Sequence, residues 1–312
     1  MSPMEELRRF LATQSQTEIL RLALGVPNPD APELAKHLIV NTIDCESFVH
    51  DHTRVTEVGL VSFSGNDTRP LISRPTAHAE NILQQCYFYH FRILANAHCV
   101  NRTFCKGEPE NNHFGHTRFV TESQLKDVLD DAFGWPIDPA KPELGFCPVV
   151  FLGHAISNDL SMLNRAVGFN SSSLGTVVAT IDTQDIANEN GIRGAGDNIG
   201  LTSLAARFGF ATRDAHTAGN DTAYTLIAAV QMALQDKLPE GVKSMQKVIH
   251  DLADYSQMSS SSDFGIANFC TRCGQYGDHR RPECRERVRC AKCATAGRGK
   301  AIRTHTTAMC SR

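Results

Sequence analysis

The sequence predicts an α/β protein in which helices flank a mixed sheet of about five strands, with a small Cys/His module at the C-terminal end. Three strand-like apolar runs come early in the chain, and helices then alternate with strands, which is typical of a mixed sheet covered by helices. Six of the eleven cysteines follow residue 269, so the C-terminal segment differs in kind from the body. A length of 312 residues suits one large domain with a small appendage.

The first part of the chain is predicted to supply one helix and three strands. Residues 1–35 show an amphipathic helical pattern that ends in a Pro-rich turn, and we expect a single helical extension there. Apolar strands follow at residues 38–43 and 55–63, and the aromatic run at 87–91 indicates a third buried element. Residues 98–122 form an irregular Asn/His/Gly-rich segment that is longer than most loops, so we expect it either to be functional or to wrap over the surface.

The second part of the chain alternates between helix and strand. We expect helices at 122–133, 158–167, 201–208 and 220–234, a buried strand at 149–152 and a further strand at 177–181. The Ser-rich stretch at 256–262 predicts a flexible linker before the cysteine-rich tail.

The charged residues, like the cysteines, are distributed unevenly between the body and the C-terminal segment. Residues 270–312 hold 11 of the 31 Lys and Arg but 3 of the 34 Asp and Glu, which leaves 20 basic and 31 acidic residues in the body. A basic tail on an acidic body indicates a polyanion-binding appendage, although a solvated tail without a partner would look the same. No apolar run approaches the roughly 20 residues of a membrane span, and residues 1–25 lack the apolar core of a secretory signal. We therefore expect a cytoplasmic or nuclear protein that does not bind membranes.

Carboxylates stand at the ends of predicted elements. Asp44 and Glu46 close the first strand and share one face of it, Asp159 follows the most apolar strand, and Asp221 opens the last long helix five residues after His216. Like charges at a buried strand end are tolerated where a divalent cation lies between them. Taken singly, each motif also has a plain interpretation, as a strand end in solvent or a helix cap.

The order of these motifs resembles that of the DEDDh 3′–5′ exonucleases, which have an RNase H-like fold, across residues 38–235. Accessory marks agree at residues 56–59, 181–183 and 201–205. His-x₄-Asp occurs twice, at His154/Asp159 and His216/Asp221. The family places its catalytic histidine beside the last carboxylate, so the resemblance assigns that role to His216 and leaves His154 as structural or near the substrate.

The resemblance implies two-metal phosphodiester hydrolysis at a 3′ end, releasing nucleoside 5′-monophosphates from RNA or DNA, with single-stranded ends as the expected substrate. Four carboxylates suit two Mg²⁺ or Mn²⁺ ions about 4 Å apart. Asp44 would bridge the ions, Glu46 and Asp221 would complete one site, and Asp159 would serve the other. His216 would take the proton from the attacking water. A catalytically silent nucleic-acid or protein-binding adaptor with the same fold is the alternative.

A narrower resemblance is to a fungal group that includes the Argonaute-interacting exonuclease of RNA quelling. It rests on Asn101-Arg102, on residues 114–117 and on residues 216–221. It implies a protein partner such as an RNA-silencing factor.

The tail offers eight zinc ligands in two sets. Each half supplies three cysteines and one histidine, and His-x₄-Cys recurs in both. The ligands in order are Cys270, Cys273, His279, Cys284, Cys290, Cys293, His305 and Cys310. Two Cys₃His sites or one Cys₄ ribbon of Cys270, Cys273, Cys290 and Cys293 both fit these spacings, so one or two structural Zn²⁺ are expected. The arginines between the ligands would contact phosphates.

These features divide the chain into four parts. We expect an N-terminal helical extension at residues 1–35, a DEDDh exonuclease domain at 36–250, a Ser-rich linker at 251–269 and a zinc-binding tail at 270–312.

Overall fold

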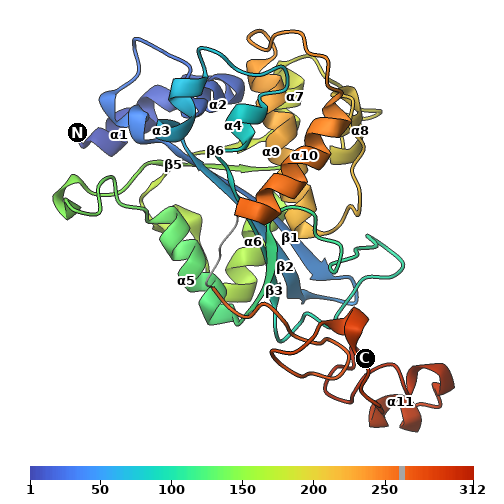
Figure 1. Cartoon of the computed structure of the whole chain (residues 1–312). Coiled ribbons are helices and arrows are strands. Elements are labelled where there is room, and N and C mark those ends of the chain that lie inside the picture. The colour runs from blue at the N-terminus through green and yellow to red at the C-terminus, as the bar shows by residue number, and fades with distance from the viewer. Residues whose placement is uncertain (260–263) are drawn as a thin grey trace.

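A six-stranded sheet forms the centre of the computed structural model, which describes residues 1–259 and 264–312 (Figure 1). The strand order is β4-β3-β2-β1-β5-β6. The strands are β1 (Ile39–Phe48), β2 (Asp51–Ser64), β3 (Tyr87–Ile93), β4 (His116–Val120), β5 (Val149–Gly153) and β6 (Val177–Asp182). The β1–β2 and β2–β3 pairs are antiparallel, and the β3–β4, β1–β5 and β5–β6 pairs are parallel. The predicted mixed sheet is confirmed.

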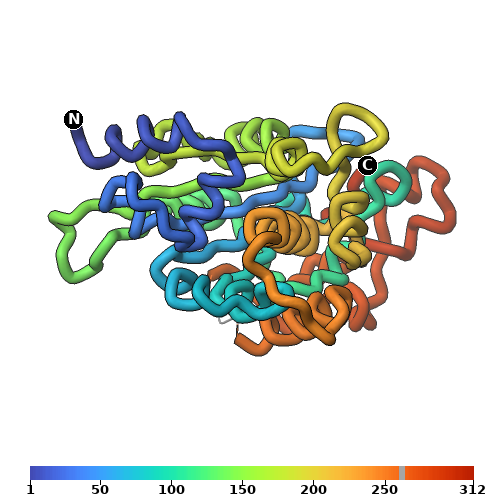
Figure 2. The backbone as a smooth tube through the Cα atoms, turned by 90° about the horizontal axis from the view of Figure 1, so that it is seen from above, coloured from blue at the N-terminus to red at the C-terminus, as the bar shows by residue number. Residues whose placement is uncertain are grey.

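Helices cover both faces of this sheet (Figure 1). The helices are α1 (Pro3–Leu11), α2 (Gln16–Leu24), α3 (Gly65–Thr68), α4 (Glu80–Leu83), α5 (Glu122–Phe133), α6 (Ser157–Val167), α7 (Thr183–Glu189), α8 (Leu201–Arg207), α9 (Ala218–Leu234), α10 (Met245–Ser259) and α11 (Ala291–Thr295). The last of these, α11, lies in the C-terminal module, away from the sheet. The C-terminal Cys/His module lies at the opposite end of the molecule from α1 (Figure 2). Among the described residues, no helix combines the length and apolar character that crossing a membrane requires.

Strand β5 shows why two helical layers form. All of its residues are buried, as expected for a parallel strand covered on both faces. Because side chains alternate along a strand, Val149 and Phe151 join the core beneath α5 and α6, whereas Val150 and Leu152 join the core beneath α9. The ring of Phe151 meets that of Phe133, at the end of α5, with centroids 5.0 Å apart. β5 therefore fixes both layers around the centre of the sheet.

The prediction of a single helix over residues 1–35 is wrong, because the segment contains two. Ser2 caps α1 in a reciprocal capping box with Glu5, and Ser15 caps α2 by accepting a hydrogen bond from the Glu18 amide. A second cap inside the amphipathic pattern ends one helix and starts another, which periodicity alone does not reveal.

Strand β4 was also missed, since it lies inside the segment expected to be irregular. It has five residues, and it pairs in parallel with β3 while burying Phe119 and Val120. Helices α7 and α10 had no counterpart in the prediction either. Short elements such as β4 carry too few periods to be recognised, so the sheet has six strands where about five were expected.

The predicted linker at 251–269 begins too early. Helix α10 continues through Ser259, and its Val248, Ile249 and Leu252 are buried at helical spacing. The hydroxyl of Ser256 is an acceptor for the Gly115 amide at 2.9 Å. Serines 260–262 of the predicted linker lie outside the described residues.

After residue 263, the chain pairs with the edge of the sheet. Ile266 and Phe119 exchange two backbone hydrogen bonds of 2.8 and 2.9 Å as an antiparallel bridge on β4. The following Phe269 packs its ring against that of Phe119, with centroids 5.6 Å apart. The C-terminal module is therefore docked directly onto strand β4.

Gly59 allows α9 to approach the sheet. A Cβ at this position of β2 would overlap the carbonyl oxygen of Ala218 and the hydroxyl of Thr222. Only glycine permits so close an approach of helix and strand. The first turn of α9, which carries Asp221, consequently lies directly against β2 and next to β1.

Candidate active site

The end of β5 leaves space on the sheet beside β1. β1 pairs with β5 only over residues 39–42 but continues along β2 to Phe48, so Asp44 and Glu46 lie past the last β5 pairing. The expectation that these carboxylates close the first strand is wrong, since they lie within it. They face a cavity of about 440 Å³ because the neighbouring parallel strand has ended.

All five residues that the sequence singled out line this one cavity. Two come from β1, one from the first turn of α6, one from the first turn of α9 and one from the turn before α9. They are Asp44, Glu46, Asp159, Asp221 and His216. Residues far apart in the sequence therefore meet at one place.

Asp44 lies among the other three carboxylates. Loss of hydration raises its pKa well above the usual range, and the charges of Asp159, Asp221 and Glu46 raise it further. Its Oδ2 atom is buried and has no hydrogen-bond partner among the described residues, and the same holds for Oδ1 of Asp221. Such orphaned buried oxygens are costly unless a cation or a proton satisfies them.

Asp159 and Asp221 are both buried, and burial raises the pKa of each to about 7. Hydrogen bonds from backbone amides oppose this effect in both cases. The Cys45 amide donates to Asp159 Oδ1 at 2.8 Å, and the His216 amide donates to Asp221 Oδ2 at 2.9 Å. These hydrogen bonds orient one oxygen of each carboxylate and leave the other free to bind a ligand.

His216 stands at the rim of the cavity. Its side chain is half exposed, and Nδ1 lies 3.6 Å from Oε1 of Glu46. The interaction with Glu46 raises the pKa of His216, although partial burial opposes it. Donor atoms of Glu46, His216 and Asp221 all lie within 4.8 Å of one another. The imidazole of His216 is thus held next to the carboxylates and is partly exposed to solvent.

His154 also lines the cavity, but it serves the turn before α6. Its Nδ1 lies 2.6 Å from the hydroxyl of Thr183, and burial lowers its pKa. The Asp182 carboxylate accepts hydrogen bonds from the amides of Ala155 and Ile156 at 3.1 and 3.0 Å. Asp182 and Thr183 therefore fix the turn that delivers Asp159.

A buried polar chain that the sequence did not reveal supports the start of α9. Glu57 Oε2 lies 3.0 Å from Nε2 of His90, whose Nδ1 lies 2.9 Å from the Thr117 hydroxyl. The Ala218 amide, at the start of α9, donates to the same Glu57 oxygen at 3.4 Å. Glu57 belonged to an accessory mark, but nothing in the sequence relates it to His90 or Thr117. Only the pairing of β2, β3 and β4 brings them together.

The donor set suits divalent cations. Four carboxylates with two orphaned buried oxygens provide hard oxygen ligands, which Mg²⁺ and Mn²⁺ prefer. Burial, and after it the repulsion between these carboxylates, raises their pKa values, and a bound cation would offset both effects.

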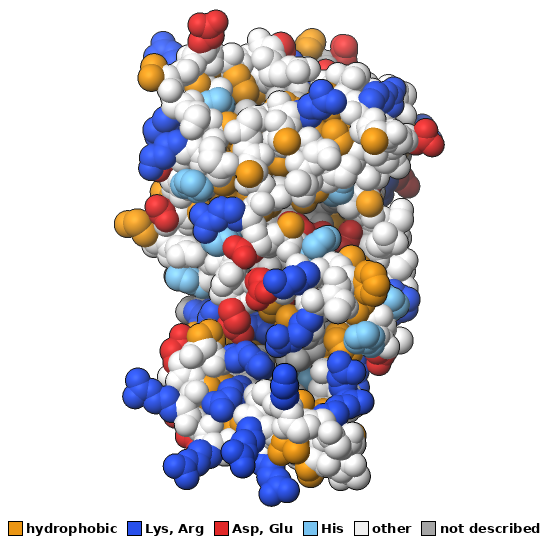
Figure 3. All heavy atoms as spheres, turned by 90° about the vertical axis from the view of Figure 1, so that its right-hand side faces the viewer, with side chains coloured by type: hydrophobic (Ala, Val, Ile, Leu, Met, Phe, Trp, Pro, Cys, Tyr) orange, Lys and Arg blue, Asp and Glu red, His pale blue; other side chains and the backbone are white. Residues whose placement is uncertain are grey.

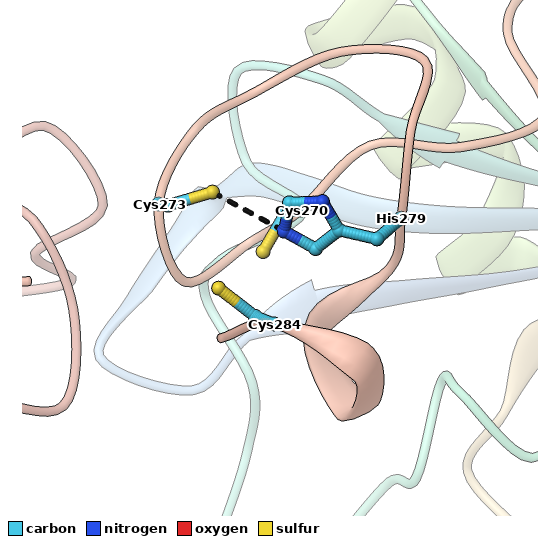
Figure 4. Close-up of side chains that lie close together, drawn as sticks. All are labelled: Cys270, Cys273, His279 and Cys284. Carbon is cyan, nitrogen blue, oxygen red and sulfur yellow. Dashed lines mark hydrogen bonds between the residues drawn. The ribbon is translucent and has the colours of Figure 1, made fainter. Parts of the chain in front are cut away.

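Two further donor clusters lie in the C-terminal module. In the first, the donor atoms of Cys270, Cys273, His279 and Cys284 lie within 4.8 Å of one another. Figure 4 shows these side chains converging, with Cys273 Sγ 3.5 Å from His279 Nε2. The second cluster meets the same criterion and consists of Cys290, Cys293, His305 and Cys310. This grouping corresponds to two Cys₃His sets rather than to the ribbon pairing, and either set could bind zinc.

Comparison with known proteins identifies the family. A domain model described as "DNA polymerase III subunit epsilon-like, C-terminal domain", of the DEDDh_C family, matches residues 39–232. The chain belongs to the DEDDh exonuclease family. This membership supports a nuclease function, and the matched range contains all five cavity residues. No curated protein sequence matches this DEDDh chain.

Solved structures of exonuclease I are similar to this DEDDh chain at low identity. One exonuclease I structure has 12% identity and a TM-score of 0.39, over 70% of this chain and 43% of its own. The zinc-bound E. coli exonuclease I–ssDNA complex has 12% identity and a TM-score of 0.38, over 69% and 42%. A product-bound exonuclease I has 13% identity and a TM-score of 0.38, over 70% and 46%. The chain thus spans less than half the length of these proteins.

The metal-free DEDDh chain should become less stable as the pH rises. Asp159 and Asp221 hold protons up to about pH 7 when folded, whereas unfolded aspartates ionise near pH 4. The folded state therefore binds more protons across this window, and stability falls with pH between these two values. We expect Tm to drop by on the order of 5 °C between pH 5.5 and 7.5 in EDTA.

Thermal unfolding followed by circular dichroism measures this drop. Asp159→Asn should flatten the pH dependence, and Mn²⁺ at pH 7.5 should restore the lost stability. A Tm that rises over this range in EDTA would contradict the arrangement of buried, crowded carboxylates.

Proposed function

We propose that the chain is a metal-dependent 3′–5′ exonuclease that hydrolyses phosphodiester bonds of RNA or DNA and releases nucleoside 5′-monophosphates. The main support is the meeting of four carboxylates and one histidine in a single cavity, with two buried carboxylate oxygens lacking partners. A silent adaptor would have no need of this costly cluster of like charges.

Each cavity residue has a proposed role. Asp44 would be shared between two Mg²⁺ or Mn²⁺ ions, because it interacts electrostatically with all three other carboxylates. Glu46 and Asp221 would complete one site, and Asp159 would serve the other, partly through water. The bound ions supply electrostatic stabilisation of the attacking and leaving oxygens. His216, oriented by Glu46, would accept the proton of the attacking water.

The direct test uses matched RNA and DNA oligonucleotides that carry a 5′ label. With Mn²⁺, we expect a ladder of products shortened one nucleotide at a time from the 3′ end, and nucleoside 5′-monophosphates in solution. Blocking the 3′ end should stop the reaction. Internal cuts would refute the 3′–5′ direction, whereas binding without any cleavage would favour the adaptor function.

The C-terminal module is proposed to attract the nucleic acid. Figure 3 shows Lys and Arg side chains gathered over this lower part of the molecule, below a band of Asp, Glu and His side chains. The exposed basic residues of the module are Arg285, Arg287, Arg289, Lys292, Arg298, Lys300, Arg303 and Arg312. Such a surface binds phosphates with strong salt dependence, and a single-stranded 3′ end is the substrate that we favour.

Zinc content should be near two ions per chain. Each Cys₃His set offers a full tetrahedral ligand set, and so small a module needs metal in place of a large apolar core. Elemental analysis of protein purified without chelators measures the ratio. Cys273→Ser should lower it to about one. A ratio near one in the unaltered chain would favour the single-ribbon pairing.

We also propose domain limits, a protein partner and a cellular location for this chain. We propose the helical extension at residues 1–35 and the zinc-binding tail at 270–312, with the exonuclease domain extended from 36 to 259 because α10 belongs to it. We propose three further properties from the sequence alone. They are membership of the fungal quelling group, a partner such as an RNA-silencing factor, and a cytoplasmic or nuclear location.

A further inference from the structure

The turn that carries His216 has a backbone that needs support. Asp214 and His216 adopt φ values of 48° and 59°, in the left-handed region that non-glycine residues rarely occupy. Such conformations are strained, and they persist only where the surroundings fix them. Contacts from outside residues 214–216 must therefore hold this turn.

Part of the support comes from the long segment that the sequence marked as irregular. A Cβ on the buried Gly107 would overlap the carbonyl oxygen of His216, so the two backbones touch. Asn111 Nδ2 donates to one carboxylate oxygen of Asp214 at 3.0 Å, and His113 Nε2 lies 2.7 Å from the other. We call residues 106–113 the clamp segment.

Asn220 ties the clamp segment to the catalytic helix. Its fully buried side chain accepts a hydrogen bond from the His113 amide at 2.8 Å. Its Nδ2 donates to the carbonyl oxygens of Asn111 and Asp214 at 3.0 and 3.2 Å. One amide group, next in sequence to Asp221, thus joins the clamp segment, the His216 turn and α9.

Glu110, in the middle of the clamp segment, connects this segment to the docked module through Arg92 and Phe119. Glu110 pairs with the buried Arg92 at 2.6 Å, and the Arg92 guanidinium lies over the ring of Phe119, 5.0 Å from its centroid. Phe119 is also the residue on which the module docks, through Phe269 and through Arg280, whose guanidinium lies 5.7 Å from the same centroid. An unbroken series of contacts therefore runs from the module to His216.

We propose that the clamp segment holds His216 in its reactive orientation and that the C-terminal module holds the clamp segment in place. The proposal rests on the proposed function, since it assumes that His216 accepts a proton in hydrolysis. Asp214 is then a positioning residue, and the module contributes to turnover as well as to nucleic-acid binding.

Asp214→Gly tests the clamp without adding strain, because glycine adopts positive φ readily. It removes both side-chain hydrogen bonds, and we expect kcat to fall about tenfold with KM and Mn²⁺ affinity unchanged. Asp214→Asn keeps acceptor and donor groups in place and should recover most of the loss. Gly107→Ala, which presses on the His216 carbonyl, should lower kcat in the same way.

A double variant decides whether the effect passes through His216. In the His216→Ala background, Asp214→Gly should lower kcat no further. Hydrogen exchange, which needs no turnover, should rise at the amides of residues 214–217 in Asp214→Gly but not in Asp236→Ala, a control that breaks the remote Arg21 ion pair. The same fold-loss in both backgrounds, or unchanged exchange, would overturn the clamp.

Phe269→Ala tests the role of the module in the full-length chain. We expect faster exchange at residues 106–113 and 214–217 and a kcat lowered several-fold, whereas Thr295→Ala at an exposed position of the module should leave both unchanged. Normal exchange at the clamp segment in Phe269→Ala would overturn the supporting role. A failure of the proposed function would look different, since the unaltered chain itself would not hydrolyse the oligonucleotides.

Discussion

Asp44→Asn is expected to abolish phosphodiester hydrolysis while making the metal-free chain more stable at neutral pH. Asp44 is the carboxylate whose pKa is raised by burial and by all three other acidic groups of the cavity. The amide is neutral without binding a proton, so the cost of burying or protonating this carboxylate disappears. The substitution also removes the ligand proposed to be shared by both ions. We expect kcat to fall by at least about 10³-fold and Tm in EDTA at pH 7.5 to rise.

The two opposite effects separate a catalytic role from a structural one. A variant that merely damages the fold would lose activity and stability together, whereas Asp44→Asn should lose the first and gain the second. Asp236→Asn, just beyond the C-terminal end of α9, is the matched control and should keep its activity. Mn²⁺-dependent hydrolysis that survives in Asp44→Asn, with the usual rate, would refute the proposed site.

Elements with a long, strong apolar pattern could be predicted from the sequence. The limits expected for α5 match the structure, and β5, β6 and α9 were placed within a few residues. Their periodicity reflects burial, which is a property of the local sequence. α1 and α2 were merged because a Ser15 cap interrupts the pattern only locally, and β4 was missed because its stability comes from pairing with β3 and Ile266, which lie far away in sequence.

The candidate site also has one part that could be predicted from the sequence and another that could not. Asp44, Glu46, Asp159, His216 and Asp221 could be found because their side-chain chemistry and order are visible in one dimension. The residues that hold these side chains in place could not be identified from the sequence. Asn220 forms hydrogen bonds to Asn111 and His113, and Glu57 to His90, each across more than 30 residues of sequence. No sequence motif reveals these pairings.

His216→Ala is expected to lower kcat by about 10² to 10⁴-fold while Mn²⁺ binding to the carboxylates stays close to normal. The side chain lies at the rim, half exposed, and its imidazole interacts with Glu46, whereas its backbone amide, which the substitution keeps, is the group that orients Asp221. Calorimetric titration of Mn²⁺ and single-turnover hydrolysis measure the two quantities separately.

The pH profile gives the sharper test of this role. A general base must be neutral to accept a proton, so activity at saturating Mn²⁺ should rise as the pH passes through the pKa of His216. The interaction with Glu46 raises that pKa in the metal-free chain, and a cation bound to Glu46 would oppose this effect. The enzyme should be slower in mild acid, where the imidazole is protonated. His216→Ala should lose this limb of the profile, and added imidazole should recover part of the rate because the vacated position opens to solvent. An unchanged profile in the variant would mean that another group takes the proton and that His216 only helps to shape the cavity.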